Sequence, residues 1–400
     1  MSGFFNSIRT GTITFIASPK RDERIDFLRG MALLIIFIDH VPDNFFSPYT
    51  FHAFSFADAA EVFFFISGFI AAIVYGRVMA QKGLLAAVRK VLRRASVVYT
   101  AQLILLGLIL MTVGIFMLID SDPGLIAPFR ISQFYSQPFE MLGQALILRF
   151  QPAYLDILPV YVLLLLFFPF ALAALARNVW FILVPSFALW LTVQVFGIDL
   201  TITTGENWFF NPFAWQFLFV LGATFGSPRL RKQMTFLDSR ILFWIAAVVA
   251  AVIAVIQFFS ALHAVDPSFP GLRPAWLPID KSSLDPLRIV SLLALALVVS
   301  RVLPPRGVLH RYLPAQLVIW CGQNSLQVFC FGALLSSFTL LTGFLNGHDA
   351  WVQSTLCVAG IGLQFLFAAY LLWSKNGGRL LPEAAPDGVA MQRGPSDTRV

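Results

Sequence analysis

The first apolar segment of the chain carries ionisable side chains that membrane-buried helices rarely contain. His40 follows Arg29 by eleven positions, and eleven steps of about 100° return to nearly the same helix face about 16 Å further along. Asp26 falls within roughly 40° of that face. An imidazole can accept a proton from a hydroxyl group, and a guanidinium group pairs well with phosphate. The stripe therefore predicts a proton-transfer residue deep along one helix wall and an anion-binding residue at its mouth.

The depth of His40 depends on where this first helix ends. Its apolar part, Leu28–Val41, spans only about 21 Å of a hydrocarbon core that is about 30 Å thick, and Pro42 then interrupts regular helix. This length predicts that His40 lies in a recess below the outer surface. The alternative interpretation is that Asp39 and His40 form an ordinary helix end at the water boundary.

Two carboxylates open the second apolar segment. Asp58 and Glu61 stand three positions apart and thus share one helix face. Asp58 could simply favour a helix N-terminus, whereas Glu61 lies one turn deeper and precedes an apolar run, which favours a functional role. Ser67 and Gly68 are small enough to let another helix approach closely.

Amide and hydroxyl side chains interrupt an apolar run late in the chain, at Gln323, Asn324, Ser325 and Gln327. Such groups often tie membrane helices together, and the alternative is a hydrogen-bond shell for a polar ligand. The segment 211–216 begins another apolar run in a similar way, with less reason to expect a direct role.

A basic patch follows the second apolar segment and continues to the start of the third. Its members are Arg77, Lys82, Arg89, Lys90, Arg93 and Arg94. Membrane topology and lipid headgroups explain such a patch, and a phosphate-rich donor such as a coenzyme A thioester is the alternative. The sequence contains no Walker loop, no GxSxG elbow and no His/Cys metal cluster, which argues against an ATPase, a serine hydrolase and a metal enzyme.

The composition shows what must position these residues. Hydrophobic residues make up 58% of the 400 residues and charged residues only 12%, and 42 residues are Phe, which is incompatible with an ordinary water-exposed surface. Backbone groups find no hydrogen bonds in lipid, so the apolar runs must be helical. The sequence predicts an all-α membrane bundle of about ten transmembrane helices near 27–41, 57–80, 95–119, 157–176, 179–197, 211–226, 239–262, 286–303, 315–342 and 350–373.

The distribution of positive charge predicts the orientation of this bundle. With both termini in the cytoplasm, all but five of the 28 Lys and Arg residues fall on the cytoplasmic side, as the positive-inside rule requires. The five are Arg130, Arg149, Arg273, Lys281 and Arg288. The net charge of +7 therefore reflects topology, and we expect no nucleic-acid partner. Cys321, Cys330 and Cys357 lie in apolar runs and are interpreted as packing residues.

Three parts are expected along the chain: a cytoplasmic N-terminal segment over 1–26, a membrane domain over 27–373 and a disordered cytoplasmic tail over 374–400. Two outside segments, Asp120–Asp156 and His263–Asp285, are long enough to cap the bundle or to touch a ligand. Met141–Phe150 is too short to span a bilayer and is expected to be an interfacial helix.

Four segments in order give the chain a resemblance to a known family. They are Arg24–Gly30 with Asp39 and His40, Ala57–Phe63 with Ser67 and Gly68, Asn211–Gln216, and Gly322–Phe329. At these positions the sequence resembles the OpgC family, which is similar to the wider acyltransferase-three class of membrane acyltransferases. The Phe-rich run after Glu61 departs from the family pattern and should alter packing more than chemistry.

The resemblance implies a multi-pass protein of the bacterial inner membrane that transfers succinyl residues from succinyl-CoA to osmoregulated periplasmic glucans. It implies that His40 is the catalytic histidine and that Arg29 belongs to the donor path. The acyl-CoA is then a substrate, and no tightly bound cofactor or metal is expected. The implied partners are the glucan, the acyl-CoA, the lipid bilayer and other proteins of glucan synthesis.

A mechanism can be written as a hypothesis. His40 takes the proton of a sugar hydroxyl during attack on the thioester, or alternatively carries the acyl group itself. Asp39 or Glu61 orients the imidazole, and Asn324 or Gln327 donates to the developing oxyanion. Arg29, Asp26, Asp58, Asn324, Gln327, Arg93 and Arg94 are the expected substrate-binding residues.

Two other classes of function compete with the enzyme. A transporter or flippase of a glycan or lipid-linked precursor would also place polar residues in a bundle, but it should show paired halves with unwound helices, and the sequence has no such symmetry. A noncatalytic scaffold predicts that His40, Glu61 and Asn324 point to unrelated places.

Overall fold

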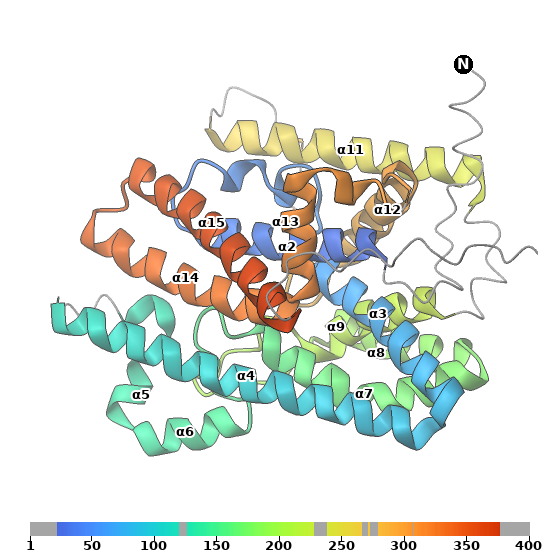
Figure 1. Ribbon diagram of the computed structural model, residues 1–400, viewed down its shortest axis with the longest axis horizontal. Coiled ribbons are helices and arrows are strands. Elements are labelled where there is room, and N and C mark those ends of the chain that lie inside the picture. The colour runs from blue at the N-terminus through green and yellow to red at the C-terminus, as the bar shows by residue number, and fades with distance from the viewer. Residues whose placement is uncertain are drawn as a thin grey trace, which may run out of the picture.

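The computed structural model describes residues 22–119, 126–227, 238–265, 271–272, 279–305 and 307–376. The regular elements in these ranges are helices (Figure 1). The longer ones are α2 (Glu23–His40), α3 (Ala59–Lys82), α4 (Leu84–Ile119), α7 (Ile157–Arg177), α8 (Trp180–Phe196), α9 (Pro212–Gly226), α11 (Arg240–Val265), α12 (Pro286–Val302), α13 (Leu313–Gln323), α14 (Ser325–Leu345) and α15 (Ala350–Lys375). Short elements are η1 (Ser47–Tyr49), η2 (Phe51–Ala53), η4 (Ala127–Phe129), α5 (Ser132–Ser136), α6 (Pro138–Leu146) and η6 (Leu309–Arg311). The expected tail beyond residue 376, and the expected N-terminal segment before residue 22, lie outside the described residues.

Each predicted membrane segment coincides with helix, with two differences in the boundaries. The segment predicted over 315–342 is two helices, α13 and α14, because Asn324 leaves the helical conformation between them. The helix predicted from residue 95 begins at Leu84, directly after Gly83, whose φ of 83° ends α3. The basic residues of this first part of α4 hide it from a hydropathy pattern, although Leu, Ala, Lys and Arg are all good helix formers.

Six helices of the described chain are long and apolar enough to cross a membrane, namely α3, α4, α7, α11, α14 and α15, and α8 and α9 are shorter apolar helices. The protein is therefore a membrane protein, while the predicted count of about ten spans is not confirmed. The helix α2 falls short by composition because it carries five charged residues, and three of them, Asp26, Arg29 and Asp39, are among the residues singled out for chemistry. Large apolar side chains are exposed along the outer helices, such as Leu118 (88%), Ile241 (73%) and Phe196 (74%), as lipid contact requires.

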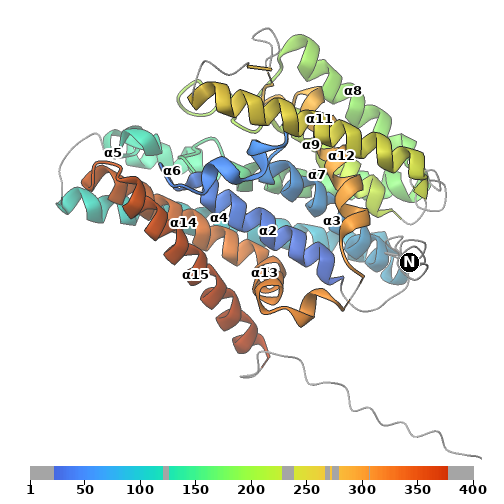
Figure 2. The same cartoon turned by 90° about the horizontal axis from the view of Figure 1, so that it is seen from above.

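The helix that carries His40 lies in the middle of the molecule. Figure 1 shows α11 along one edge, α4 along the opposite edge and α2 between them. In the view turned by 90°, α2 again runs through the centre, with α14 and α15 on one side and α8 and α9 on the other (Figure 2). This position surrounds the charged residues of α2 with protein.

Glycines set the closest helix contacts. At Gly30 of α2 and Gly322 of α13, a Cβ atom would collide with the carbonyl oxygens of Val318 and Asp26 respectively. The helices α3 and α9 meet in the same way, since a Cβ atom at Gly68 or Gly222 would collide with a backbone carbonyl of the partner helix. The backbones therefore touch directly at two crossings, which is the usual role of small residues in membrane helices.

Candidate active site

Matching stripes of α2 and α14 face one another. Each stripe follows the i, i+3, i+4, i+7 spacing of a single helix face. On α2 it consists of Leu33, Ile36, Phe37 and His40, and on α14 of Phe329, Gly332, Ala333 and Ser336. One turn earlier, the guanidinium group of Arg29 donates a hydrogen bond to the hydroxyl oxygen of Ser325. The spacing from Arg29 to His40 equals that from Ser325 to Ser336, so the two helices run parallel and in register.

The two stripes enclose a cavity at the C-terminal end of α2, here called the His40 cavity. Its empty volume, which includes open solvent, is about 340 Å³, and Tyr154, Asp156 and Ile157 line it from the segment that leads into α7. The rings of His40 and Tyr154 meet edge to face, with centroids 5.1 Å apart and planes at 72°. The expected outside segment 120–156 therefore contributes its last residues to the site, while residues 120–125 of it lie outside the description.

The surroundings of His40 select one tautomer of its ring. The Nδ1 atom contacts the carbonyl oxygen of Ile36, one turn earlier in the same helix. A carbonyl oxygen can only accept a hydrogen bond, so Nδ1 carries the proton and Nε2 is left with its lone pair. The Nε2 atom of His40 is therefore the atom that can accept a proton.

Asp156 is a functional candidate that the sequence interpretation missed. It lies directly before α7 and lines the cavity together with His40. Burial raises the pKa of this carboxyl group, and protonation of the nearby His40 acts in the opposite direction. A carboxylate in this position stabilises an imidazolium ion. Only its place at the junction of a long outside segment and an apolar run could have drawn attention to it.

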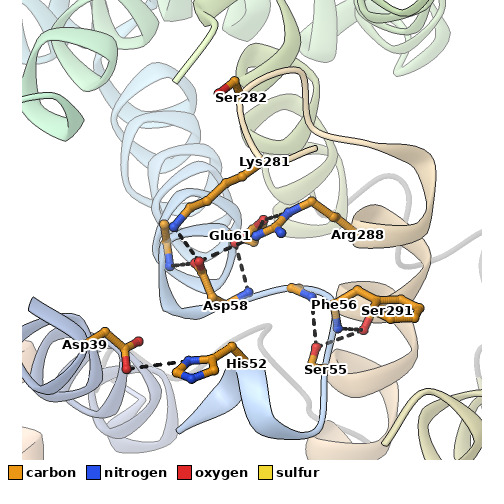
Figure 3. Close-up of polar contacts among 12 residues, drawn as sticks. Asp39, His52, Ser55, Phe56, Asp58, Glu61, Lys281, Ser282, Arg288 and Ser291 are labelled. Carbon is orange, nitrogen blue, oxygen red and sulfur yellow. Dashed lines mark hydrogen bonds and ion pairs between the residues drawn. The ribbon is translucent and has the colours of Figure 1, made fainter. Parts of the chain in front are cut away.

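Asp39 belongs to a different cavity from its neighbour His40. Consecutive helical residues point about 100° apart, and Asp39 accepts a hydrogen bond from the Thr50 hydroxyl at 2.6 Å. His52 faces it, with Nδ1 3.7 Å from the Asp39 carboxylate (Figure 3). Asp39 is thus directed to the segment after α2 and away from the His40 ring.

Asp58 and Glu61 form a buried ionic cluster with Lys281 and Arg288 (Figure 3). Asp58 caps α3, and Glu61 closes the capping box by accepting the backbone N–H of Asp58 at 3.0 Å. Arg288 donates from Nε and Nη2 to Glu61 Oε1 at 2.5 Å, and Lys281 Nζ lies 2.5 Å from Asp58 Oδ2. Burial alone would raise the pKa of Asp58, but the ammonium group of Lys281 lowers it below the usual range.

The cluster joins two acidic and two basic side chains, so each buried ionisable group has a partner of the opposite type. Glu61 is fully buried and is not among the residues that line the His40 cavity. Helix capping and the attachment of α12 to α3 therefore explain why Glu61 stands three positions after Asp58.

The amides near the start of α14 are not among the residues that line the cavity. Asn324 is buried at the break between α13 and α14, where its side chain donates to Trp320 O at 3.0 Å and accepts from Lys375 Nζ at 2.5 Å. Gln327 is exposed. It stands about 160° around α14 from Phe329, and so opposite the cavity face. His40, Glu61 and Asn324 are thus placed in three separate surroundings, which is the arrangement that the scaffold alternative predicts, so these three residues do not exclude it.

The remaining predicted residues lie on α2 and α4. Asp26 is 2% exposed, and its carbonyl packs against Gly322. Arg93 is exposed, whereas Arg94 is half-buried and close enough to Tyr75 and Cys330 for an electrostatic interaction. Among the basic patch residues, Arg94 is the one directed between α3 and α14.

Comparison with known proteins gives one match. The family model described as OpgC protein matches residues 21–376, which is most of the chain. The chain belongs to the OpgC family. No curated protein and no solved structure matches it. Membership of the OpgC family indicates an acyltransferase-like role in glucan modification.

The structure explains how the four segments that carry the OpgC resemblance fit together. They associate in two pairs, because Gly322 of the fourth segment packs on the backbone of Asp26 in the first. Gly68 of the second segment packs on Phe219 of α9, the helix that begins in the third. In this OpgC protein the first pair carries Arg29 and His40, and the second carries the buried ionic cluster.

Proposed function

We propose that the protein is an inner-membrane O-acyltransferase that moves a succinyl group from cytoplasmic succinyl-CoA to hydroxyl groups of a periplasmic glucan. The observation that supports this most directly is the His40 cavity. There a histidine with a free Nε2 lone pair shares a small enclosed space with a carboxylate. Family membership supports the acyl-transfer chemistry.

The proposed reaction uses His40 as a general base. Nε2 takes the proton of a glucan hydroxyl while the hydroxyl oxygen attacks the thioester carbonyl carbon. The C–S bond then breaks, and the leaving thiolate takes the proton back from the imidazolium, which yields the ester and free coenzyme A. Asp156 stabilises the imidazolium between these steps, a role that sequence reasoning gave to Asp39 or Glu61. In a variant of this scheme, His40 itself carries the acyl group. Trapping of an acylated protein in the absence of acceptor distinguishes the two schemes.

The donor is proposed to enter along the facing stripes of α2 and α14. Arg29 and Ser325 stand at the opposite end of these stripes from His40. The thioester arm of the donor must reach along the stripes from that end to His40. Arg94 is the second cation at that end and suits a phosphate of the donor. Asp26 and Asn324 hold the helix crossings around this entrance, and Arg93 lies on its exposed side.

A topology of about ten spans with both termini in the cytoplasm is part of the proposal. It requires α2 and α14 to run in the same direction and α15 to return to the side where α14 begins. The parallel register of α2 and α14 and the contact between Lys375 and Asn324 agree with both requirements. Other proteins of glucan synthesis are the expected partners on the periplasmic side.

The proposal is tested in a bacterial strain that lacks this chain, with mass spectrometry of its periplasmic glucans. Wild-type protein should restore succinylated glucan, and His40→Ala at equal membrane abundance should not. His310→Ala is the matched control, because His310 pairs with Glu23 at the opposite end of α2. Normal succinylation by the His40→Ala protein would overturn the proposal. Glucan that loses its periplasmic location without any change in acylation would instead point to transport.

A further inference from the structure

A second hollow opens from the last turn of α2, and the proposed chemistry at His40 does not use it. This Asp39 groove is lined by Asp39, Asp43, Asn44, Ser47, His52 and Ala53, with Ala261 of α11 also on its wall. Its empty volume of about 890 Å³, which includes open solvent, exceeds the 340 Å³ of the His40 cavity. Hollows of this size accommodate small molecules or single sugar units.

Hydrogen bonds in the groove leave acceptor atoms directed at a ligand. Thr50 Oγ1 lies 2.6 Å from Asp39 Oδ1, 2.9 Å from His52 Nδ1 and 3.0 Å from Ser47 O. The shortest of these contacts joins the hydroxyl to a carboxylate, so Thr50 donates to Asp39 and accepts from His52. His52 Nε2 then keeps its lone pair, and Asp39 Oδ2 has no partner within the described chain. Two acceptors therefore remain for hydroxyl donors.

The walls of the groove are fixed before any ligand arrives. The Asn44 side chain accepts the backbone N–H groups of Phe46 and Ser47, both at 2.9 Å, and so shapes the turn after α2. Gln257 of α11 donates to the carbonyl of His52 at 2.8 Å. Ser55 is bonded to Ser291 of α12 at 2.8 Å (Figure 3). A site whose groups are already held in place loses little freedom on binding.

Aromatic rings stand exposed on the same segment. Tyr49 is 81% exposed and Phe46 is 42% exposed, while Phe45 packs edge to face on Trp351 of α15 with centroids 4.9 Å apart. Trp351 is itself 75% exposed. Aromatic rings offer an apolar face, and Tyr and Trp add a polar group; the C–H face of a pyranose fits such a surface.

The charge of the groove favours one of the two substrates. Its lining includes two carboxylates and, within the described residues, neither Lys nor Arg. The phosphates of an acyl-CoA would be repelled there, whereas a neutral polyhydroxylated ligand would not.

We propose that the Asp39 groove binds a glucose unit of the acceptor glucan, an inference that rests on the proposed function. Asp39 and His52 accept hydrogen bonds from its hydroxyl groups, and a neighbouring unit reaches His40 around the last turn of α2. Asp39 thereby belongs to the site that binds the acceptor, and the next residue, His40, belongs to the site of the reaction.

The test measures binding of a neutral glucopentaose to the full chain in lipid nanodiscs by saturation-transfer NMR and calorimetry, with no donor present. Asp39→Asn and His52→Ala should each raise Kd about tenfold or more. Ala53→Trp should block binding by filling the groove without removing a polar contact. The surface control Glu206→Gln, at a carboxylate that pairs with Arg130 elsewhere, should bind as wild type does.

Unchanged pentaose affinity in Asp39→Asn, His52→Ala and Ala53→Trp would refute sugar binding in the Asp39 groove. Failure of the wild-type protein to bind the pentaose would refute it as well. Ala53→Trp keeps the test decisive where a polar variant does not fold. The proposed function fails separately: a protein that binds pentaose through the groove but transfers no acyl group from succinyl-CoA would refute the reaction and leave the groove in place.

Discussion

Two groups of ionisable residues lie near the same end of the bundle and differ in how their charges are satisfied. In the cluster of Asp58, Glu61, Lys281 and Arg288, every charge contacts an opposite charge, and the result is an attachment between α3 and α12. In the His40 cavity, an imidazole and a carboxylate face open space. Buried charges that satisfy one another hold a structure, whereas polar groups that face a cavity are available to a ligand.

The largest effect on activity is expected from the cavity. Replacement of His40 by Ala should lower the rate of acyl transfer by about 10²–10⁴-fold, the usual contribution of a general base. The thermal unfolding temperature should stay close to that of the wild type, because the ring contacts Tyr154 by only one edge. Transfer assays and thermal unfolding on the same purified protein measure both. If His40→Ala lost folded protein to the same extent as activity, the cavity and the ionic cluster would no longer differ in their roles.

The cluster should respond in the opposite way. Arg288→Ala leaves Glu61 buried without its main partner, which should destabilise the protein by about 3–5 kcal/mol. Activity should then fall only in proportion to the amount of folded protein. The paired change Glu61→Leu with Arg288→Met should recover much of the stability, as measured by thermal unfolding in detergent. Normal stability but abolished turnover in Arg288→Ala would show that the cluster takes part in the chemistry.

Asp156 tests whether the carboxylate of the cavity supports the histidine. Asp156→Asn keeps the shape and removes the charge, so the imidazolium loses its stabilising partner and kcat should fall about 10–100-fold. The KM for the donor should change little, and Asp156→Glu should recover part of the rate. Steady-state kinetics with varied succinyl-CoA separate these values. A change confined to KM would assign Asp156 to donor binding instead.

A smaller effect is expected from the volume of the cavity. Ser336→Leu places an apolar side chain into the space between α2 and α14 and should lower kcat/KM about tenfold. Ser337→Ala, at the next position of the same helix, is the control, because the Ser337 hydroxyl bonds back to Ala333 within α14. Equal kinetics for both variants would show that the substrate does not enter this cavity.

Much of the fold could be predicted from the sequence, because apolar runs in lipid must be helical. The break at Asn324 could not, since the contact that stabilises it comes from Lys375 at the end of another helix. The first part of α4 was missed for a different reason, because its exposed basic residues conceal a regular helix. Local patterns therefore located the helices better than their interruptions.

The candidate site was predictable along one helix but not between helices. The spacing of Arg29 and His40 placed them on one stripe, and the structure adds the α14 stripe that faces it. Glu61 looked functional because its counter-charge Arg288 is far away in sequence. Asp156 was overlooked because nothing near it in the chain indicates that it meets His40.

The direct backbone contacts at Gly30 and Gly322 limit which parts of the protein can move. Sliding of α2 along α13 would drive carbonyl oxygens into the facing main chain, so the helix that carries the histidine acts as a fixed frame. Admission of substrate to the cavity then depends on α14 or on the connection before α7, where Tyr154 adopts a left-handed backbone conformation with φ of 69°. This connection can open and close while the helix that carries His40 keeps its position.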